Sequence, residues 1–111
     1  MLGGYVSAAI LLLSGLAGIA IPDRVATALL TRFDEPRGRL EFRVAYATFA
    51  GLGAWALAIG DREVFIGIGF LWLGAAAVRL IWTMIDRPRI DATYWAYLAL
   101  ELGLGAAGVF S

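Results

Sequence analysis

The sequence contains neither cysteine nor histidine. Their absence excludes disulfides, thiol redox chemistry, His-ligated haem, a histidine proton shuttle and zinc sites of the usual type. Lysine is also absent, because all nine basic residues are arginine, and nine acidic residues balance them. The resulting zero net charge provides no overall field that would attract nucleic acid. We therefore expect no cofactor, no metal and no nucleic-acid partner.

Apolar residues, by contrast, are abundant and make up 61% of the 111 residues. A chain this short has too much surface to bury them all in a soluble core, so a lipid-facing surface explains the excess better. Clusters of charge separate four apolar stretches, each near the length of about 20 residues with which a helix crosses a bilayer. The stretches lack the alternation of membrane strands. We predict one all-α transmembrane domain over residues 1–111, an antiparallel four-helix bundle with spans at 3–21, 41–60, 64–85 and 92–110 and a charged connection at 22–40.

The first apolar stretch has no basic residue ahead of it. A cleavable signal peptide normally carries a positively charged segment there, so we interpret the stretch as an uncleaved first span. A signal sequence that is removed remains the alternative.

The first connection allows two interpretations. Pro22 is typical of a helix start, and a helix from there would align Val25, Leu29 and Leu30 in an apolar stripe. Such a stripe favours a short interfacial helix with Phe33 near its end. An irregular charged loop fits the same residues. In the second connection, residues 60–63 predict a tight turn.

The distribution of arginine predicts the orientation. One arginine lies in the second connection, Arg62, whereas seven lie in or beside the first and third: Arg24, Arg32, Arg37, Arg39, Arg43, Arg87 and Arg89. Loops rich in arginine stay in the cytoplasm. We therefore expect an integral protein of the bacterial inner membrane, with the first and third connections cytoplasmic and both termini outward.

Small residues spaced four apart predict where helices pack closely in lipid. Three pairs have this spacing, one each in the first, second and fourth spans: Ser14 and Gly18, Ala47 and Gly51, and Ala99 and Gly103. The spacing does not separate contacts within the chain from contacts in an oligomer.

Two charged residues lie inside predicted spans, Arg79 in the third and Glu101 in the fourth. A charge near the bilayer centre costs about 2.5–3.5 kcal/mol on insertion scales. The two depths differ by only about 6 Å at a rise of about 1.5 Å per residue, so we predict that the two side chains pair across the hairpin. The predicted polar cluster also includes residues at the cytoplasmic helix ends, and its members are Glu41, Arg43, Arg79, Asp86 and Glu101. Such a cluster either fixes helix register or lines a site for a headgroup, an anion or a proton.

The order of several polar and small residues resembles an uncharacterised family of small bacterial four-helix integral membrane proteins that is broadly DoxX-like. The resemblance covers roughly residues 39–105 and rests on Arg43, Tyr46, Gly51, Arg79-Leu80, Asp86, Pro88 and Glu101-Leu102-Gly103. The family's Asp-Gly-x-Pro segment differs here, where Asp86-Arg87-Pro88 stands. The resemblance implies a four-helix bundle with a polar set at these positions and no known activity. DoxX-type thiol chemistry does not transfer, because the chain has no cysteine.

Three classes of function remain open. The first is a non-enzymatic membrane protein, either an accessory subunit or a binder of lipid or a small apolar ligand, with membrane lipids, further copies of the chain or a larger complex as partners. The alternative is a small oligomeric transporter or channel that uses Glu101 and Arg79 as a polar intramembrane site. An intramembrane enzyme is the third class, and we predict no catalytic residues, since no serine or threonine neighbours a candidate base in the sequence.

Overall fold

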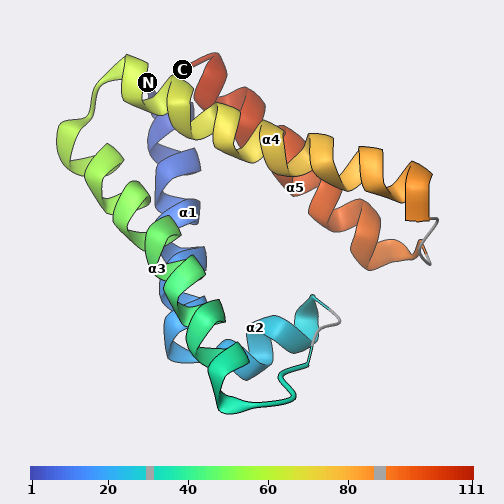
Figure 1. Cartoon of the computed structure of the whole chain (residues 1–111). Coiled ribbons are helices and arrows are strands. Elements are labelled where there is room, and N and C mark those ends of the chain that lie inside the picture. The colour runs from blue at the N-terminus through green and yellow to red at the C-terminus, as the bar shows by residue number, and fades with distance from the viewer. Residues whose placement is uncertain (30–31, 87–89) are drawn as a thin grey trace. The chain divides into compact units, whose positions relative to one another are not determined.

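The computed structural model describes residues 1–29, 32–86 and 90–111. Throughout this part of the chain the regular structure is helical and no strand occurs, which confirms the all-α prediction. The helices, coloured along the chain in Figure 1, are α1 (Leu2–Ala20), α2 (Pro22–Ala28), α3 (Pro36–Ile59), α4 (Arg62–Asp86) and α5 (Ala92–Val109).

The chain forms two compact units. The first unit consists of residues 1–7 and 59–111, and therefore contains the start of α1 together with α4 and α5. The second unit, residues 8–58, contains the rest of α1, the short helix α2 and nearly all of α3.

Helix α2 resolves the choice left open for the first connection. Residues 22–28 are helical, with Pro22 in the first turn, where its missing N–H group costs nothing. The helix ends before Leu29, whose N–H group bonds back to the carbonyl of Val25. Phe33 lies outside any helix, and Leu30 of the predicted stripe falls outside the described residues. The segment is thus a short helix followed by an irregular stretch.

Helix α3 begins earlier than predicted, at Pro36 instead of residue 41. Proline is well suited to a first helical turn. Arg37, the next residue, forms an i,i+4 ion pair with Glu41 at an N–O distance of 3.7 Å. The charged residues that suggested a loop therefore belong to an exposed helical turn.

The turn between α3 and α4 is tight, as predicted. Gly60 has a φ of 64°, the left-handed conformation that favours glycine after a helix. Asp61 follows, and its carboxylate accepts a hydrogen bond of 3.4 Å from the backbone N–H of Glu63. The turn is therefore confined to two residues.

In the third connection, residues 87–89 fall outside the described part of the chain.

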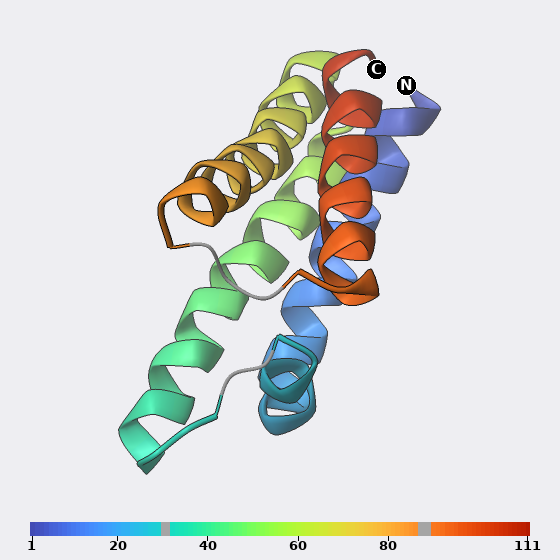
Figure 2. The same cartoon turned by 90° about the vertical axis from the view of Figure 1, so that its right-hand side faces the viewer.

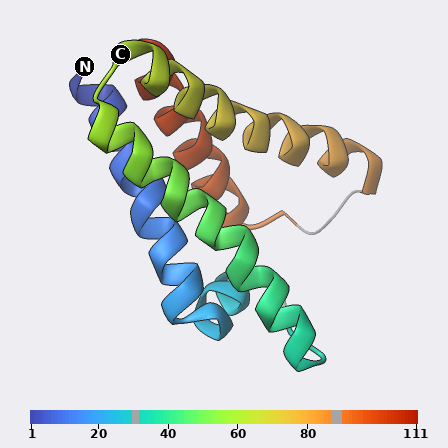
Figure 3. The same cartoon turned by 60° about the vertical axis from the view of Figure 1, so that its left-hand side comes forward.

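In the second unit, α1 and α3 lie side by side, in blue and green in Figure 3, at a spacing that glycine permits. A Cβ atom on Gly15 would collide with the backbone of Tyr46 and Ala50 on α3. A Cβ atom on Gly53 would lie 2.6 Å from the backbone nitrogen of Leu12 on α1. Gly18, from a predicted small-residue pair, faces the ring of Tyr46.

In the first unit, α4 packs along α5 as a hairpin (Figure 2). Gly69 of α4 meets Gly105 and Gly108 of α5, and a Cβ atom on Gly108 would lie 2.6 Å from the Cα atom of Gly69. Phe65, fully buried, packs edge to face against Tyr5 at a ring distance of 4.7 Å. These contacts join the start of α1 to the hairpin.

Two glycines of the predicted packing pairs do not take part in these contacts. Gly51 on α3 and Gly103 on α5 are exposed, and a Cβ atom on either would meet nothing within 4 Å. Neither glycine therefore packs against another helix within its own unit, because four-residue spacing recurs on several faces of a helix rich in small residues.

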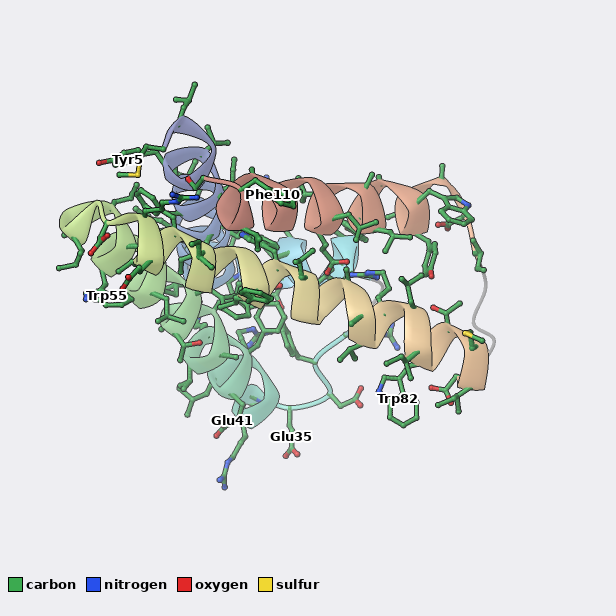
Figure 4. All side chains as sticks on the ribbon, turned by 90° about the horizontal axis from the view of Figure 1, so that it is seen from above. Tyr5, Glu35, Glu41, Trp55, Trp82 and Phe110 are labelled. Carbon is green, nitrogen blue, oxygen red and sulfur yellow. The ribbon has the colours of Figure 1, made fainter. Side chains whose placement is uncertain are left out.

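Three helices, α1, α3 and α4, are long and apolar enough to cross a membrane. The 18-residue helix α5 is not among them, although it is wholly described. Large apolar side chains remain exposed on these helices, including Phe70, Met84 and Trp82, and Figure 4 shows Trp82 directed away from the α4 ribbon. The protein therefore presents an apolar exterior.

Candidate functional site

The candidate site lies in the first unit, where Arg79 of α4 faces Glu101 of α5. The Nε–H group of Arg79 donates to Oε1 of Glu101 at 2.6 Å, and an Nη2–H group donates to Oε2 at 3.3 Å. Two parallel bonds of this kind fix the orientation of both groups and are stronger than bonds between neutral groups. The structure thus brings together the two charges whose similar depth predicted a pair.

Both side chains of the pair are largely removed from solvent. The Glu101 side chain is 11% exposed and the Arg79 side chain 28%. A lone carboxylate so deeply buried would be strongly unfavourable, whereas the guanidinium neutralises it and occupies both oxygens. Glu101 is consequently enclosed, and Arg79 is the member of the pair that outside groups can reach.

Two tyrosine rings of α5 flank the guanidinium. The Cζ atom of Arg79 lies 5.4 Å from the ring centroid of Tyr97 and 6.0 Å from that of Tyr94. Aromatic faces attract a cation within about 6 Å. The rings therefore favour the charged guanidinium and restrict its movement.

Thr83 links the two helices next to the ion pair. Its hydroxyl donates to the backbone carbonyl of Arg79 and lies 3.0 Å from the hydroxyl of Tyr94. Since the single hydroxyl proton of Thr83 is engaged, Tyr94 donates its own proton to the Thr83 oxygen. This chain of hydrogen bonds sets the position of Tyr94 relative to α4.

The start of α5 is itself fixed by a cap. Asp91 adopts an extended conformation and its Oδ1 atom accepts from the backbone N–H of Tyr94 at 3.1 Å. An aspartate in this position satisfies an N–H group that the helix leaves free. The cap therefore determines where α5 begins and, through the helix, where Tyr94, Tyr97 and Glu101 lie.

Of the remaining members of the predicted cluster, one belongs to the first unit and two belong to the second. Asp86 is the last residue of α4 and is exposed, two turns beyond the pair. Glu41 belongs to the second unit, is exposed and pairs with Arg37. Figure 4 shows its side chain pointing away from the ribbon. Arg43 is exposed on the same helix. Within the first unit, only Arg79 and Glu101 come together.

A second cross-helix ion pair, not anticipated from the sequence, joins α2 to α3 in the second unit. Arg39 donates from Nε and Nη2 to Oδ1 of Asp23 at 3.2 and 3.1 Å, and its Cζ atom lies 5.7 Å from the ring centroid of Phe33. The two side chains are 40% and 64% exposed. Solvent screens such a pair, which therefore orients α2 more than it stabilises the fold.

Sequence reasoning missed the polar neighbours of the pair. It did not assign Thr83, Tyr94 or Tyr97 to the surroundings of the pair. A signal existed, because Thr83 follows Arg79 by four residues and Tyr97 precedes Glu101 by four. Residues four apart share one helix face.

The chemistry available at the site is charge pairing and hydrogen bonding. No group of three or more potential metal-ligating side chains occurs among the described residues. Comparison of the chain with protein-family models, curated proteins and solved structures finds no match.

Proposed function

We propose that this chain is a four-span integral membrane protein without catalytic machinery, an accessory subunit or a binder of lipid or a small apolar ligand, with Arg79 and Glu101 at its polar centre. The observation that carries the proposal is an enclosed ion pair in a hairpin whose exterior is apolar. Charges enclosed by helices with apolar exteriors are typical of membrane proteins. A DoxX-like family and the bacterial inner membrane belong to the same proposal.

The exposed apolar side chains support insertion into lipid. Phe70 is 61% exposed and Met84 79% exposed, and both lie on α4. In water such a surface promotes association, whereas in a bilayer it faces hydrocarbon. The three long apolar helices are of the length that membrane spans require.

The proposed fourth span is α5, which contains Glu101 and is not among the three helices that are long and apolar enough by composition alone. Its 18 residues extend about 27 Å, near the thickness of the hydrocarbon core. Pairing with Arg79 neutralises the Glu101 carboxylate and occupies both of its oxygens, which lowers the cost of placing that carboxylate in lipid. The termini support an even number of crossings, since the hydroxyl of Ser111 donates to the carbonyl of Met1 at 3.4 Å.

The proposal is tested by extraction of membranes from cells that express the chain. We expect the protein to remain in the membrane fraction after washing with alkaline carbonate, and to be released only by detergent. Release by carbonate would contradict membrane integration.

In detergent, a non-enzymatic binder or subunit is expected to co-purify in stoichiometric amount with lipid or with another membrane protein. Purification of the chain without either would contradict that assignment.

The transporter alternative is favoured by one further observation. Ser7, fully buried in the first unit, has a hydroxyl with no hydrogen-bond partner among the described residues, and its backbone carbonyl accepts from the indole N–H of Trp72 at 3.4 Å. Trp72 precedes Arg79 by two helical turns, so polar groups recur along one face of α4. Ion or proton flux into proteoliposomes, abolished in Glu101→Gln, would favour this alternative over the first proposal.

A further inference from the structure

Arg79 has hydrogen-bond donors that its partner Glu101 does not use. A guanidinium carries five N–H groups, and Glu101 accepts from two of them, on the side formed by Nε and Nη2. Among the described residues, none accepts from the remaining three. Two of these, one on Nη1 and one on Nη2, point from the free end of the guanidinium in parallel, a geometry that matches two oxygens of one phosphate or carboxylate.

The Arg79 side chain is partly exposed on a helix with apolar neighbours. It is 28% exposed, compared with 11% for Glu101, so Arg79 is the more accessible member of the pair. Next to Arg79 on α4, the side chains of Leu80, Ile81 and Trp82 are exposed and apolar. Unsatisfied N–H groups in such surroundings cost free energy, and an acceptor supplied from outside the chain would remove that cost.

The depth of Arg79 indicates which acceptor is within reach. Arg79 lies seven residues, or about 10 Å, before the end of α4 at Asp86. A side chain as long as that of arginine can span this distance to the interface, where lipid phosphates lie. Trp82, one turn closer to the helix end, and Trp95 on α5 are both exposed and are of the type that lines this interface.

We propose that the free end of the Arg79 guanidinium binds the phosphodiester of a phospholipid headgroup from the leaflet nearest the α4–α5 connection. This inference rests on the proposed function and names its ligand class. Arg79 is the binding residue and donates both bonds to the phosphate. Glu101 is a positioning residue, which holds the Nε side and thereby turns the free end outward. The exposed apolar side chains of α4 contact the acyl chains.

The test measures phospholipid binding to the purified full chain. The protein is delipidated in mild detergent and titrated with phosphatidylglycerol, and bound lipid is counted by native mass spectrometry. We expect one tightly bound lipid in the wild type and about tenfold weaker binding in Arg79→Lys, because lysine keeps the charge but has no paired donors. The matched control Arg37→Gln removes an exposed arginine of the second unit and is expected to leave binding unchanged.

Three outcomes would overturn the inference: no bound lipid in the folded wild type, equal binding in Arg79→Lys, or equal loss in Arg37→Gln. A competition experiment adds excess inorganic phosphate to the lipid-bound protein. Displacement of the lipid by phosphate alone would show that the site binds a free anion and not a phospholipid headgroup. The double variant Arg79→Gln/Glu101→Gln removes the guanidinium without leaving an unpaired charge, and it is expected to lose the lipid while remaining folded by circular dichroism. Failure of the proposed function itself would be distinct, because carbonate would then release the protein from membranes.

Discussion

At the scale of single residues, Arg79 and Glu101 are the charges whose environment differs most from water. Because both side chains are enclosed, the charge of each is stabilised by the other. Removal of one leaves an unpaired charge among apolar side chains. The pair of Arg37 and Glu41 provides the contrast, with side chains 83% and 62% exposed. Both pairs join an arginine to a glutamate, but the first is enclosed and has two hydrogen bonds between helices, whereas the second is an exposed contact within one helix.

Substitution of Glu101 by Gln is expected to lower the free energy of unfolding by about 2 kcal/mol, because Arg79 loses its counter-charge in a largely apolar setting. Thermal unfolding in detergent measures the change. Glu41→Gln removes the same charge from the exposed pair and is expected to cost less than about 1 kcal/mol. Equal losses in the two variants would show that burial of the first pair has no energetic consequence.

At the scale of helices, close packing depends on which glycines face a neighbour. Gly108 lies against the backbone of α4, whereas Gly103, on the same helix, faces open space. In the second unit, Gly53 lies against the backbone of α1, whereas Gly51 is open. Helices α3 and α5 thus each contain one glycine that contacts a neighbouring helix and one glycine that contacts none. Substitution of the second glycine by alanine measures the effect on helix propensity alone.

Gly108→Ala is expected to destabilise the protein by about 1–3 kcal/mol, since the added methyl group would lie 2.8 Å from the Phe65 carbonyl and 2.6 Å from the Gly69 Cα atom. Gly103→Ala is expected to be neutral or stabilising by up to about 1 kcal/mol, because alanine favours a helix. Midpoints of thermal unfolding in detergent compare the two. A stable Gly108→Ala protein would contradict the observed approach of α4 and α5.

The same comparison applies to α3. Gly53→Ala is expected to destabilise the contact with α1 by about 1–3 kcal/mol, because the methyl group would collide with the backbone of Ala8 and Leu12. Gly51→Ala is expected to have no destabilising effect. Protease resistance of the detergent-solubilised variants provides the measurement. Faster cleavage of Gly51→Ala than of Gly53→Ala would contradict the assignment of the α1 contact to the face of α3 that contains Gly53.

At the scale of the whole molecule, the proposed orientation in a membrane depends on where the arginines and the termini lie. Arginines are concentrated in the first and third connections, and the two termini lie together in the first unit. Termini on one side are compatible only with an even number of crossings. The proposed four spans satisfy this condition, whereas the three helices that are apolar enough by composition would not do so alone.

The orientation is testable because the chain has no natural cysteine. A cysteine in place of Ser111 is expected to react with a membrane-impermeant maleimide applied to intact cells. A cysteine in place of Glu35, which is exposed and points away from the ribbon in Figure 4, is expected to react only after the cells are opened. Labelling of the Glu35 variant in intact cells would reverse the orientation, and equal labelling of both would indicate dual insertion.

Much of this protein is determined by local sequence. Long apolar stretches rich in alanine and leucine define the helices, Pro22 and Pro36 mark helix starts, and Gly60 marks a turn, because each preference acts within a few residues. The pairing of Arg79 with Glu101 was also predictable, since depth along a helix follows from counting residues.

Tertiary structure alone decided the rest. Whether Gly103 or Gly108 meets α4 depends on the rotation of each helix about its axis, which residue spacing leaves open. The position of Tyr94 depends on the partner that Thr83 provides. Contacts between distant segments are set by packing, and packing is a property of the folded chain rather than of its local sequence.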